Sequence, residues 1–308
     1  MKQILYIGLL IGAVGLSGCS DEMNAGTAPA HLIRLNTGII PTTRAALNRF
    51  DGETVAFAKA TASGSYTETW QAVATPSDTR LLGEQSYPAD RSYLYLRGYY
   101  PVQTLSGGEA VYKLDGQTDL MATIEQKGNL TDNFSLSSKT FYFNHLLTQI
   151  SLEVRTSREE THDLRLARVE VSGSRPEAKI LFSAAPVAGL PQVLFAGEPQ
   201  LLTAYIEPVR GGGLPLSGEA VLLPYTLLVE PGAPLTLHIK ASLPDGTMCS
   251  WDGMPVRFDE QDGVSQSGTA YRLRVTLFPT TTDPEETNCS VAASVVPWVE
   301  DRGSGTVE

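Results

Sequence analysis

The stretch QISLEVR, residues 149–155, alternates apolar and polar side chains along its whole length. Successive side chains of a β-strand point to opposite faces, so Ile150, Leu152 and Val154 share one apolar face. In a chain made of β-strands, such a face is covered by a second sheet. The stretch therefore predicts β-sheets that pack face to face.

The same pattern recurs further along the chain. Apolar residues alternate with others through residues 235–239 and residues 271–277. Five Asp-Gly pairs supply turns that tolerate positive φ, and they lie at Asp51-Gly52, Asp115-Gly116, Asp245-Gly246, Asp252-Gly253 and Asp262-Gly263. Helical periodicity is weak, and residues 155–168 hold either a turn of helix or a loop. We predict an all-β fold.

The length of 308 residues favours two domains over one. The strand that ends at Arg155 places the boundary near residue 160. Residues 175–199 and 211–234 are rich in Pro and Gly, which excludes long regular elements there.

The N-terminus has the pattern of an export signal. Lys2 precedes an apolar run from Ile4 to Leu16, which is too short to span a bilayer as a helix. The residues Leu16-Ser17-Gly18-Cys19 resemble the lipobox of bacterial lipoproteins. This resemblance implies that residues 1–18 are a signal peptide, removed before a lipid-modified (diacylglyceryl and palmitoyl) Cys19. The alternative is an ordinary signal peptide followed by an incidental cysteine.

The location follows from the same region. The acidic residues 20–22 resemble the tag that sends some Gram-negative lipoproteins to the cell surface. Two or more acyl chains anchor a protein stably, since each buried methylene contributes about 0.8 kcal/mol. We therefore expect an outer membrane lipoprotein exposed at the cell surface.

Charge argues against nucleic acid as a partner. Loss of residues 1–18 removes Lys2 and moves the formal net charge from −11 to −12. An acidic chain without a basic tract is repelled by phosphates.

Two cysteines, Cys249 and Cys289, remain once Cys19 is acylated. In an oxidising compartment they form a disulfide or stay as two thiols.

No pattern of catalytic or metal-binding residues is found. The four histidines are scattered, and Gly211-Gly212-Gly213 lacks the residues of a phosphate loop. We expect no enzyme activity, metal or cofactor, and we interpret His145 as a structural, hydrogen-bonded histidine. The tyrosines at 93, 95, 99 and 100 suggest either a glycan-stacking surface or packing within the fold.

Several segments together resemble the fimbrillin family, the subunits of type V pili. They are Leu32–Leu35 followed by Pro41–Ala45, Tyr93–Pro101, Phe143–Ile150, and Gly268–Leu273 leading to Val295–Trp298. These segments are spread over nearly the whole chain.

The resemblance implies two transthyretin-like β-sandwich domains after the signal peptide. Residues 19–44 are then a propeptide with the first strand, 45–160 the N-terminal domain and 161–308 the C-terminal domain. An arginine-specific protease is implied to cut between Arg44 and Ala45. The alternative is that Arg44 is an ordinary loop arginine, with Arg49 nearby.

Assembly by strand exchange is the implied mechanism. A strand at residues 31–40 completes a sheet in its own subunit, and its removal leaves an unpaired edge that a strand of another pilus subunit fills. We expect the donor strand at residues 291–298, with Val291, Ala293 and Val295 on one face.

The place in the pilus stays open, because the short acidic end after Trp298 offers little apolar material for a long donor. The chain is a stalk subunit, a tip or accessory subunit, or a lipid-retained anchor. A surface glycan-binding lipoprotein is the alternative function, and a secreted enzyme with a metal or carboxylate site is the third.

Overall fold

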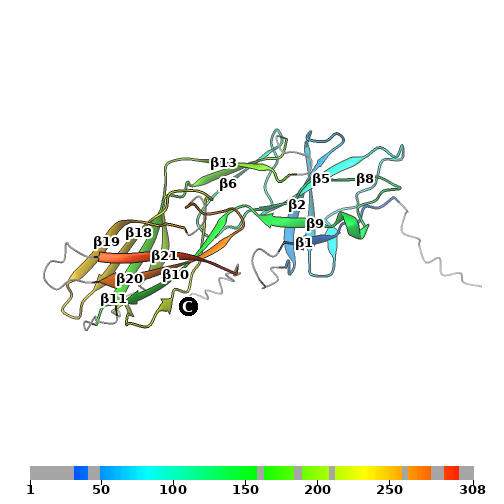
Figure 1. Ribbon diagram of the computed structural model, residues 1–308. Coiled ribbons are helices and arrows are strands. Elements are labelled where there is room, and N and C mark those ends of the chain that lie inside the picture. The colour runs from blue at the N-terminus through cyan, green and yellow to red at the C-terminus, as the bar shows by residue number, and fades with distance from the viewer. Residues whose placement is uncertain are drawn as a thin grey trace, which may run out of the picture.

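A computed structural model describes residues 31–40, 49–157, 163–183, 189–207, 212–258, 263–278 and 288–297. In these ranges the regular structure consists of strands β1 to β21 and one short 3₁₀ turn at Ser137–Lys139 (Figure 1). The all-β prediction is confirmed for this part of the chain. No helix within it is long and apolar enough to cross a membrane.

One eight-stranded sheet builds the N-terminal half, in the order β1-β9-β7-β5-β2-β3-β4 with β8 paired to β5. Strand β2 alternates between two cores: Val55 and Phe57 belong to one cluster, and Ala56 and Ala58 to another. The sheet is therefore covered on both faces. Its strands are β1 Thr37–Ile39, β2 Glu53–Ala60, β3 Glu68–Ala74, β4 Thr79–Leu81, β5 Leu94–Tyr100, β7 Met121–Ala122, β8 Gln126–Gly128 and β9 Phe141–His145.

The C-terminal half contains two five-stranded sheets. One has the order β16-β10-β20-β21 with β17 on β10, and the other has the order β14-β11-β18-β19 with β15 on β11. The strands are β10 Thr148–Thr156, β11 Arg165–Ser172, β14 Leu201–Ile206, β15 Leu214–Pro215, β16 Val221–Leu222, β17 Leu227–Val229, β18 Thr236–Ser242, β19 Met248–Pro255, β20 Ala270–Phe278 and β21 Asn288–Val296.

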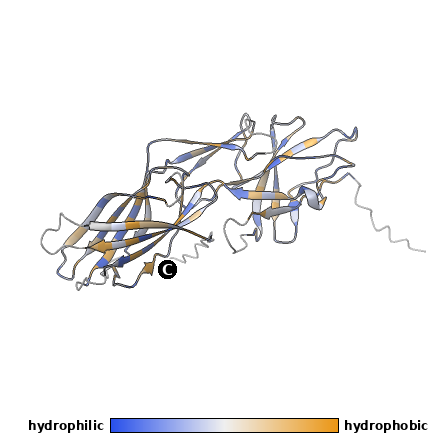
Figure 2. Ribbon diagram, viewed as in Figure 1, coloured by the Kyte–Doolittle hydropathy of each residue, from blue (hydrophilic) through white to orange (hydrophobic). Residues whose placement is uncertain are grey.

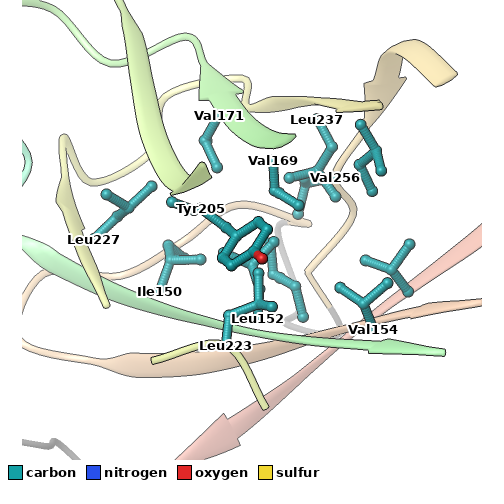
Figure 3. Packing of buried hydrophobic residues seen from close by; sticks show 14 of the residues in the cluster. Ile150, Leu152, Val154, Val169, Val171, Tyr205, Leu223, Leu227, Leu237 and Val256 are labelled. Atoms are coloured by element: carbon teal, nitrogen blue, oxygen red, sulfur yellow. The ribbon is translucent and has the colours of Figure 1, made fainter. Parts of the chain in front are cut away.

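The predicted alternating strands meet in the core between these two sheets. Strands β10 and β20 lie parallel, with Ile150 opposite Tyr271 and Leu152 opposite Leu273. These residues are fully buried, and they face Val169 of β11 and Leu237 of β18 across a single cluster (Figure 3). Figure 2 shows the alternating hydropathy along these strands. Face-to-face packing is thus confirmed in this half.

A three-stranded sheet joins distant parts of the sequence. Strand β12 (Glu177–Leu181) pairs with β13 (Gln192–Ala196) on one side and with β6 (Glu109–Lys113) on the other. The inward residues Ala178 and Ile180 pack in the same cluster as Ala56 of β2. The β12–β13 hairpin therefore covers the second face of the N-terminal sheet, although it follows β11 in the sequence (Figure 1).

A buried polar network ties this hairpin to the N-terminal sheet. Arg97 of β5 is almost completely buried; its Nη1 donates to the Gly189 carbonyl at 2.6 Å and its Nε to the Tyr66 hydroxyl at 3.0 Å. Tyr66 in turn donates to the carboxylate of Glu125. Burial raises the pKa of the Tyr66 phenol, so it stays protonated and remains a donor.

Candidate strand-exchange groove

The segment 31–40, called here the first-strand segment, lies between two backbone edges of the N-terminal sheet. On one side β1 runs parallel to β9, where the Phe141 amide donates to the Asn36 carbonyl at 2.8 Å and the Ile40 amide to the Phe143 carbonyl at 2.9 Å. We call the channel between β9 and residues 79–87 the first-strand groove.

The other side of the groove is antiparallel. The Ile33 amide donates to the Gln85 carbonyl at 2.8 Å, and the Tyr87 amide donates to the His31 carbonyl at 2.9 Å. A further bridge joins Leu35 to Thr79 of β4. Because β4 and β9 end the path of the sheet in opposite directions, the first-strand segment closes it from both sides. This geometry agrees with a predicted strand that completes its own sheet.

Two large side chains fill the floor of the groove. Ile33 and Leu35 are buried in the N-terminal core, in one cluster with Tyr87, Phe141 and other aromatic residues. Burial of a side chain of this size contributes about 1.5–3 kcal/mol. The free energy of unfolding of a whole domain is about 5–15 kcal/mol. The burial of these two residues therefore contributes a free energy of the same order as the net stability of a domain.

The next inward residue is polar. The Thr37 hydroxyl shares a hydrogen bond of 2.6 Å with the hydroxyl of Thr79, whose side chain is buried. Ile39 follows and packs against the edge of the same core. The period of two in the sequence places Thr37 on this face, but the sequence gives no sign that Thr79 is its partner.

The outward face of the first-strand segment makes two specific contacts. The side-chain amide Nδ2 of Asn36 donates to the Ser135 carbonyl at 3.1 Å. Gly38 lies opposite Tyr142 of β9, and a Cβ at this position would lie 3.1 Å from ring carbons Cδ1 and Cε1 of Tyr142. The tyrosine ring therefore lies across the glycine.

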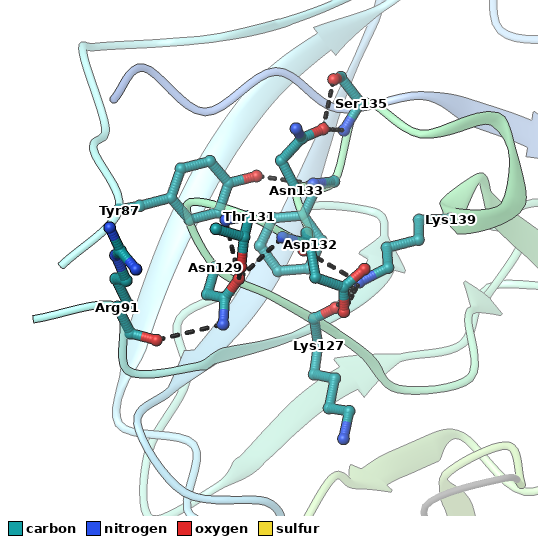
Figure 4. A network of polar contacts seen from close by, with 10 residues as sticks. Tyr87, Arg91, Lys127, Asn129, Thr131, Asp132, Asn133, Ser135 and Lys139 are labelled. Carbon is teal, nitrogen blue, oxygen red and sulfur yellow. Dashed lines mark hydrogen bonds and ion pairs between the residues drawn. The ribbon is translucent and has the colours of Figure 1, made fainter. Parts of the chain in front are cut away.

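One wall of the groove is held by contacts that do not involve the first strand (Figure 4). The Asn129 side chain accepts from the Asp132 amide at 2.8 Å and donates to the Arg91 carbonyl at 3.1 Å. Lys139 pairs with Asp132 at 2.6 Å. The Phe134 amide donates to the Tyr87 hydroxyl at 2.6 Å. These bonds link residues of the wall to one another and not to the strand that fills the groove.

The predicted donor residues lie in β21, the last strand of a C-terminal sheet, which pairs antiparallel with β20. Ala293 is buried in the core and Val291 packs against it. Val295 is 48% exposed, beyond the edge of that core. Val295 is therefore the exposed member of the three predicted residues, and β21 ends one residue later, at Val296, which packs against a core cluster.

The other predicted site residues are placed as follows. Cys19, Arg44 and Ala45 lie outside the described residues. Cys249 is buried in β19, and Cys289 lies in β21 opposite Leu277. Strand β21 approaches β19 from the neighbouring sheet (Figure 1).

The residues considered for chemistry have structural contacts. His145 is buried, and its Nδ1 lies 2.6 Å from Asp119 Oδ2, which agrees with a structural histidine. Tyr99 is fully buried and donates to the Gln103 carbonyl at 2.8 Å, so it belongs to the core. Among the described residues, no three His, Cys, Asp or Glu side chains gather as a metal site.

A model of the fimbrillin-like family matches residues 43–298, which is most of the chain. The chain therefore belongs to the fimbrillin-like family, and the predicted resemblance is confirmed. Members of this family are structural proteins of fimbriae, not enzymes. No curated protein sequence matches the chain.

Solved structures of Bacteroides proteins share the fold. A candidate cell adhesion protein from Bacteroides uniformis matches with a TM-score of 0.56 and 18% identity, over 87% of this chain and 99% of that one. A fimbrial protein from Bacteroides vulgatus matches with a TM-score of 0.52 and 14% identity, over 87% of this chain and 100% of that one. The likeness therefore extends through both halves of the chain.

Truncation of the buried groove residue tests how much the first strand stabilises the fold. We expect Leu35→Ala to lower the free energy of unfolding by about 2–5 kcal/mol, because it removes a buried side chain and leaves a cavity. Urea unfolding of the lipid-free precursor measures this. The matched control is Arg34→Ala on the exposed face, expected to change stability by less than about 0.5 kcal/mol. Equal effects of the two substitutions would contradict the conclusion that the inward-facing side chains of the first strand stabilise the fold.

Proposed function

We propose that this chain is a subunit of a type V pilus, exported as a lipoprotein precursor and assembled by strand exchange. The observation that carries the proposal is the first-strand segment, which closes the N-terminal sheet through backbone bonds on both sides. Arg44 stands between this segment and β2 in the sequence. A cut there would separate the strand covalently from the sheet that it closes.

Export and anchoring form the first stage of the proposal. Residues 1–18 direct export, and the lipid on Cys19 holds the precursor at the outer membrane with the folded chain at the cell surface. An arginine-specific protease then cuts after Arg44. Because residues 19–44 carry both the lipid and the first strand, one cut releases the subunit and opens the groove.

An opened groove exposes two unpaired strand edges and an apolar floor. Unpaired edges favour pairing with a further strand, and alternate side chains of that strand enter the positions of Ile33 and Leu35. The partner is another pilus subunit, either a second copy or a related fimbrillin.

Strand β21 is proposed as the segment that this subunit donates to the next one. It has one paired neighbour, β20, and most of its residues are small. Small side chains such as Ala293 bury little area, so detachment from its own sheet costs less than detachment of a strand of leucines.

Cleavage is tested on lipid-free precursor treated with an arginine-specific protease, with the new N-terminus determined by mass spectrometry. We expect a start at Ala45 and loss of this cut in Arg44→Ala, while Arg49→Ala keeps it. A cut at Arg49 in place of Arg44, or an intact chain, would contradict the proposed site.

Unheated denaturing gels of the cut protein then test its place in the pilus. A ladder of oligomers indicates a stalk subunit, and its absence after cutting indicates a tip or accessory subunit.

The donor assignment is tested by Val295→Asp. A charge on the donor face is not tolerated in an apolar groove, so we expect the variant to be cut normally but to lose the oligomer ladder. Val295 is half exposed, so the subunit itself should stay folded. The matched control is Ala292→Asp on the opposite, exposed face, which should keep the ladder. Intact polymerisation of Val295→Asp would rule out this donor.

A disulfide between Cys249 and Cys289 is also proposed. Cys289 precedes Val291 by two positions in the sequence, and Val291 and Ala293 pack in the same core as Cys249. Oxidation by a thiol–disulfide oxidant of the exported compartment would remove two electrons and two protons and form the bond. The disulfide would hold the start of β21 to β19, while the residues of β21 that follow it could still separate from β20.

Alkylation of the denatured chain that starts after Cys19 tests this disulfide. We expect no reactive thiol without reductant, and two after reduction. Cys249→Ser is the control, because it leaves one thiol that reacts in both conditions. Two reactive thiols in the unreduced protein would contradict the bond.

A further inference from the structure

We infer that the first-strand groove selects its donor by a side-chain code: two large apolar residues, then a hydroxyl residue, then an apolar residue, at alternate positions. A small residue is favoured directly after the hydroxyl. This inference rests on the proposed strand exchange. The occupant that it defines is an extended segment of another pilus subunit with this pattern.

The apolar positions come from the strand now in the groove. Ile33 and Leu35 are 6% and 2% exposed, and both pack in the N-terminal core. A polar side chain at either position loses its water without gaining a partner. Ile39 packs at the edge of the same core, so the fourth position favours an apolar residue less strongly.

The hydroxyl position is set by Thr79. Its side chain is 5% exposed and its hydroxyl lies 2.6 Å from that of Thr37. A donor with valine at this position has nearly the same shape but offers no hydrogen bond, so the Thr79 hydroxyl loses its partner inside the closed groove. A buried polar group left unpaired weakens binding more than the loss of a surface contact does. This makes Thr79 a specificity-determining residue of the groove.

The small position is set by Tyr142. A Cβ at position 38 would lie 3.1 Å from the tyrosine ring, which is tighter than ordinary van der Waals contact. Tyr142 is 53% exposed, so its ring has space to move away. We therefore expect a weaker selection here than at the hydroxyl position.

The chain's own β21 meets this code only in part. When it is laid along the first strand in the same direction with Ser294 beside Thr79, Ser290 and Ala292 take the two large apolar positions. When Val291 and Val295 take the second and fourth positions, Ala293 takes the hydroxyl position. In both alignments, the groove is matched better by a donor that carries the pattern of the first strand itself.

The test measures how synthetic peptides of residues 31–40 compete for the groove of lipid-free precursor that has been cut after Arg44. A fluorescent native peptide reports occupancy, and unlabelled variants compete with it. We expect Thr37→Ser to compete as well as the native sequence, and Thr37→Val to be about tenfold weaker, a difference of about 1.4 kcal/mol. Gly38→Val should be a few-fold weaker. Arg34→Gln, on the exposed face, is the matched control and should compete like the native peptide.

A reciprocal variant isolates the hydroxyl pair. In Thr79→Val protein, we expect the native peptide to lose its advantage over the Thr37→Val peptide, because the partner hydroxyl is gone. Equal binding of these two peptides to the unaltered protein would overturn the code while leaving strand exchange intact. If the native peptide itself does not enter the groove, strand exchange in this groove fails, and the code fails with it.

Discussion

The backbone of an open sheet edge must find hydrogen-bond partners, and the N-terminal half of this protein depends on how that requirement is met. Its sheet ends at β9 on one side and at β4 on the other, and the same short segment pairs with both. Closure in this way also buries Ile33 and Leu35. The segment that completes the fold is thus the segment whose loss would make the subunit reactive toward another strand.

Other contacts of the N-terminal half surround the groove. The β12–β13 hairpin covers the second face of the N-terminal sheet, and Arg97 fastens its loop through the Gly189 carbonyl. The bonds of Asn129 and Lys139 hold the wall beside Tyr87. In the proposed strand exchange, a wall held by such bonds would lower the entropy lost when a new strand enters.

The sequence predicts the features that have a local signal. The period of two identifies β10 and β20, whose apolar faces are buried, and a few segments suffice to identify the family. The pairing of β12 with β6 joins residues far apart in the chain, and no local pattern announces it. The Thr37–Thr79 pair cannot be predicted for the same reason, because threonine is common in strands and neither residue carries a local sign of its partner. The burial of Arg97 is also not predictable from the sequence. A charged side chain is expected at the surface unless its buried hydrogen-bond partners are known.

In the proposed strand exchange, the covalent link between the first strand and the domain explains how a strand of modest size protects the groove before cleavage. While residues 31–40 are tethered to β2 by a short connection, their effective concentration at the groove is in the millimolar range or above. No free donor competes at such a concentration. The proposed cut in the connection would itself remove no side chain from the groove, yet it would convert a unimolecular closure into a bimolecular one. Exchange would then be decided by which strand fills the floor of the groove best, so that the choice of partner would pass from chain connectivity to side-chain fit.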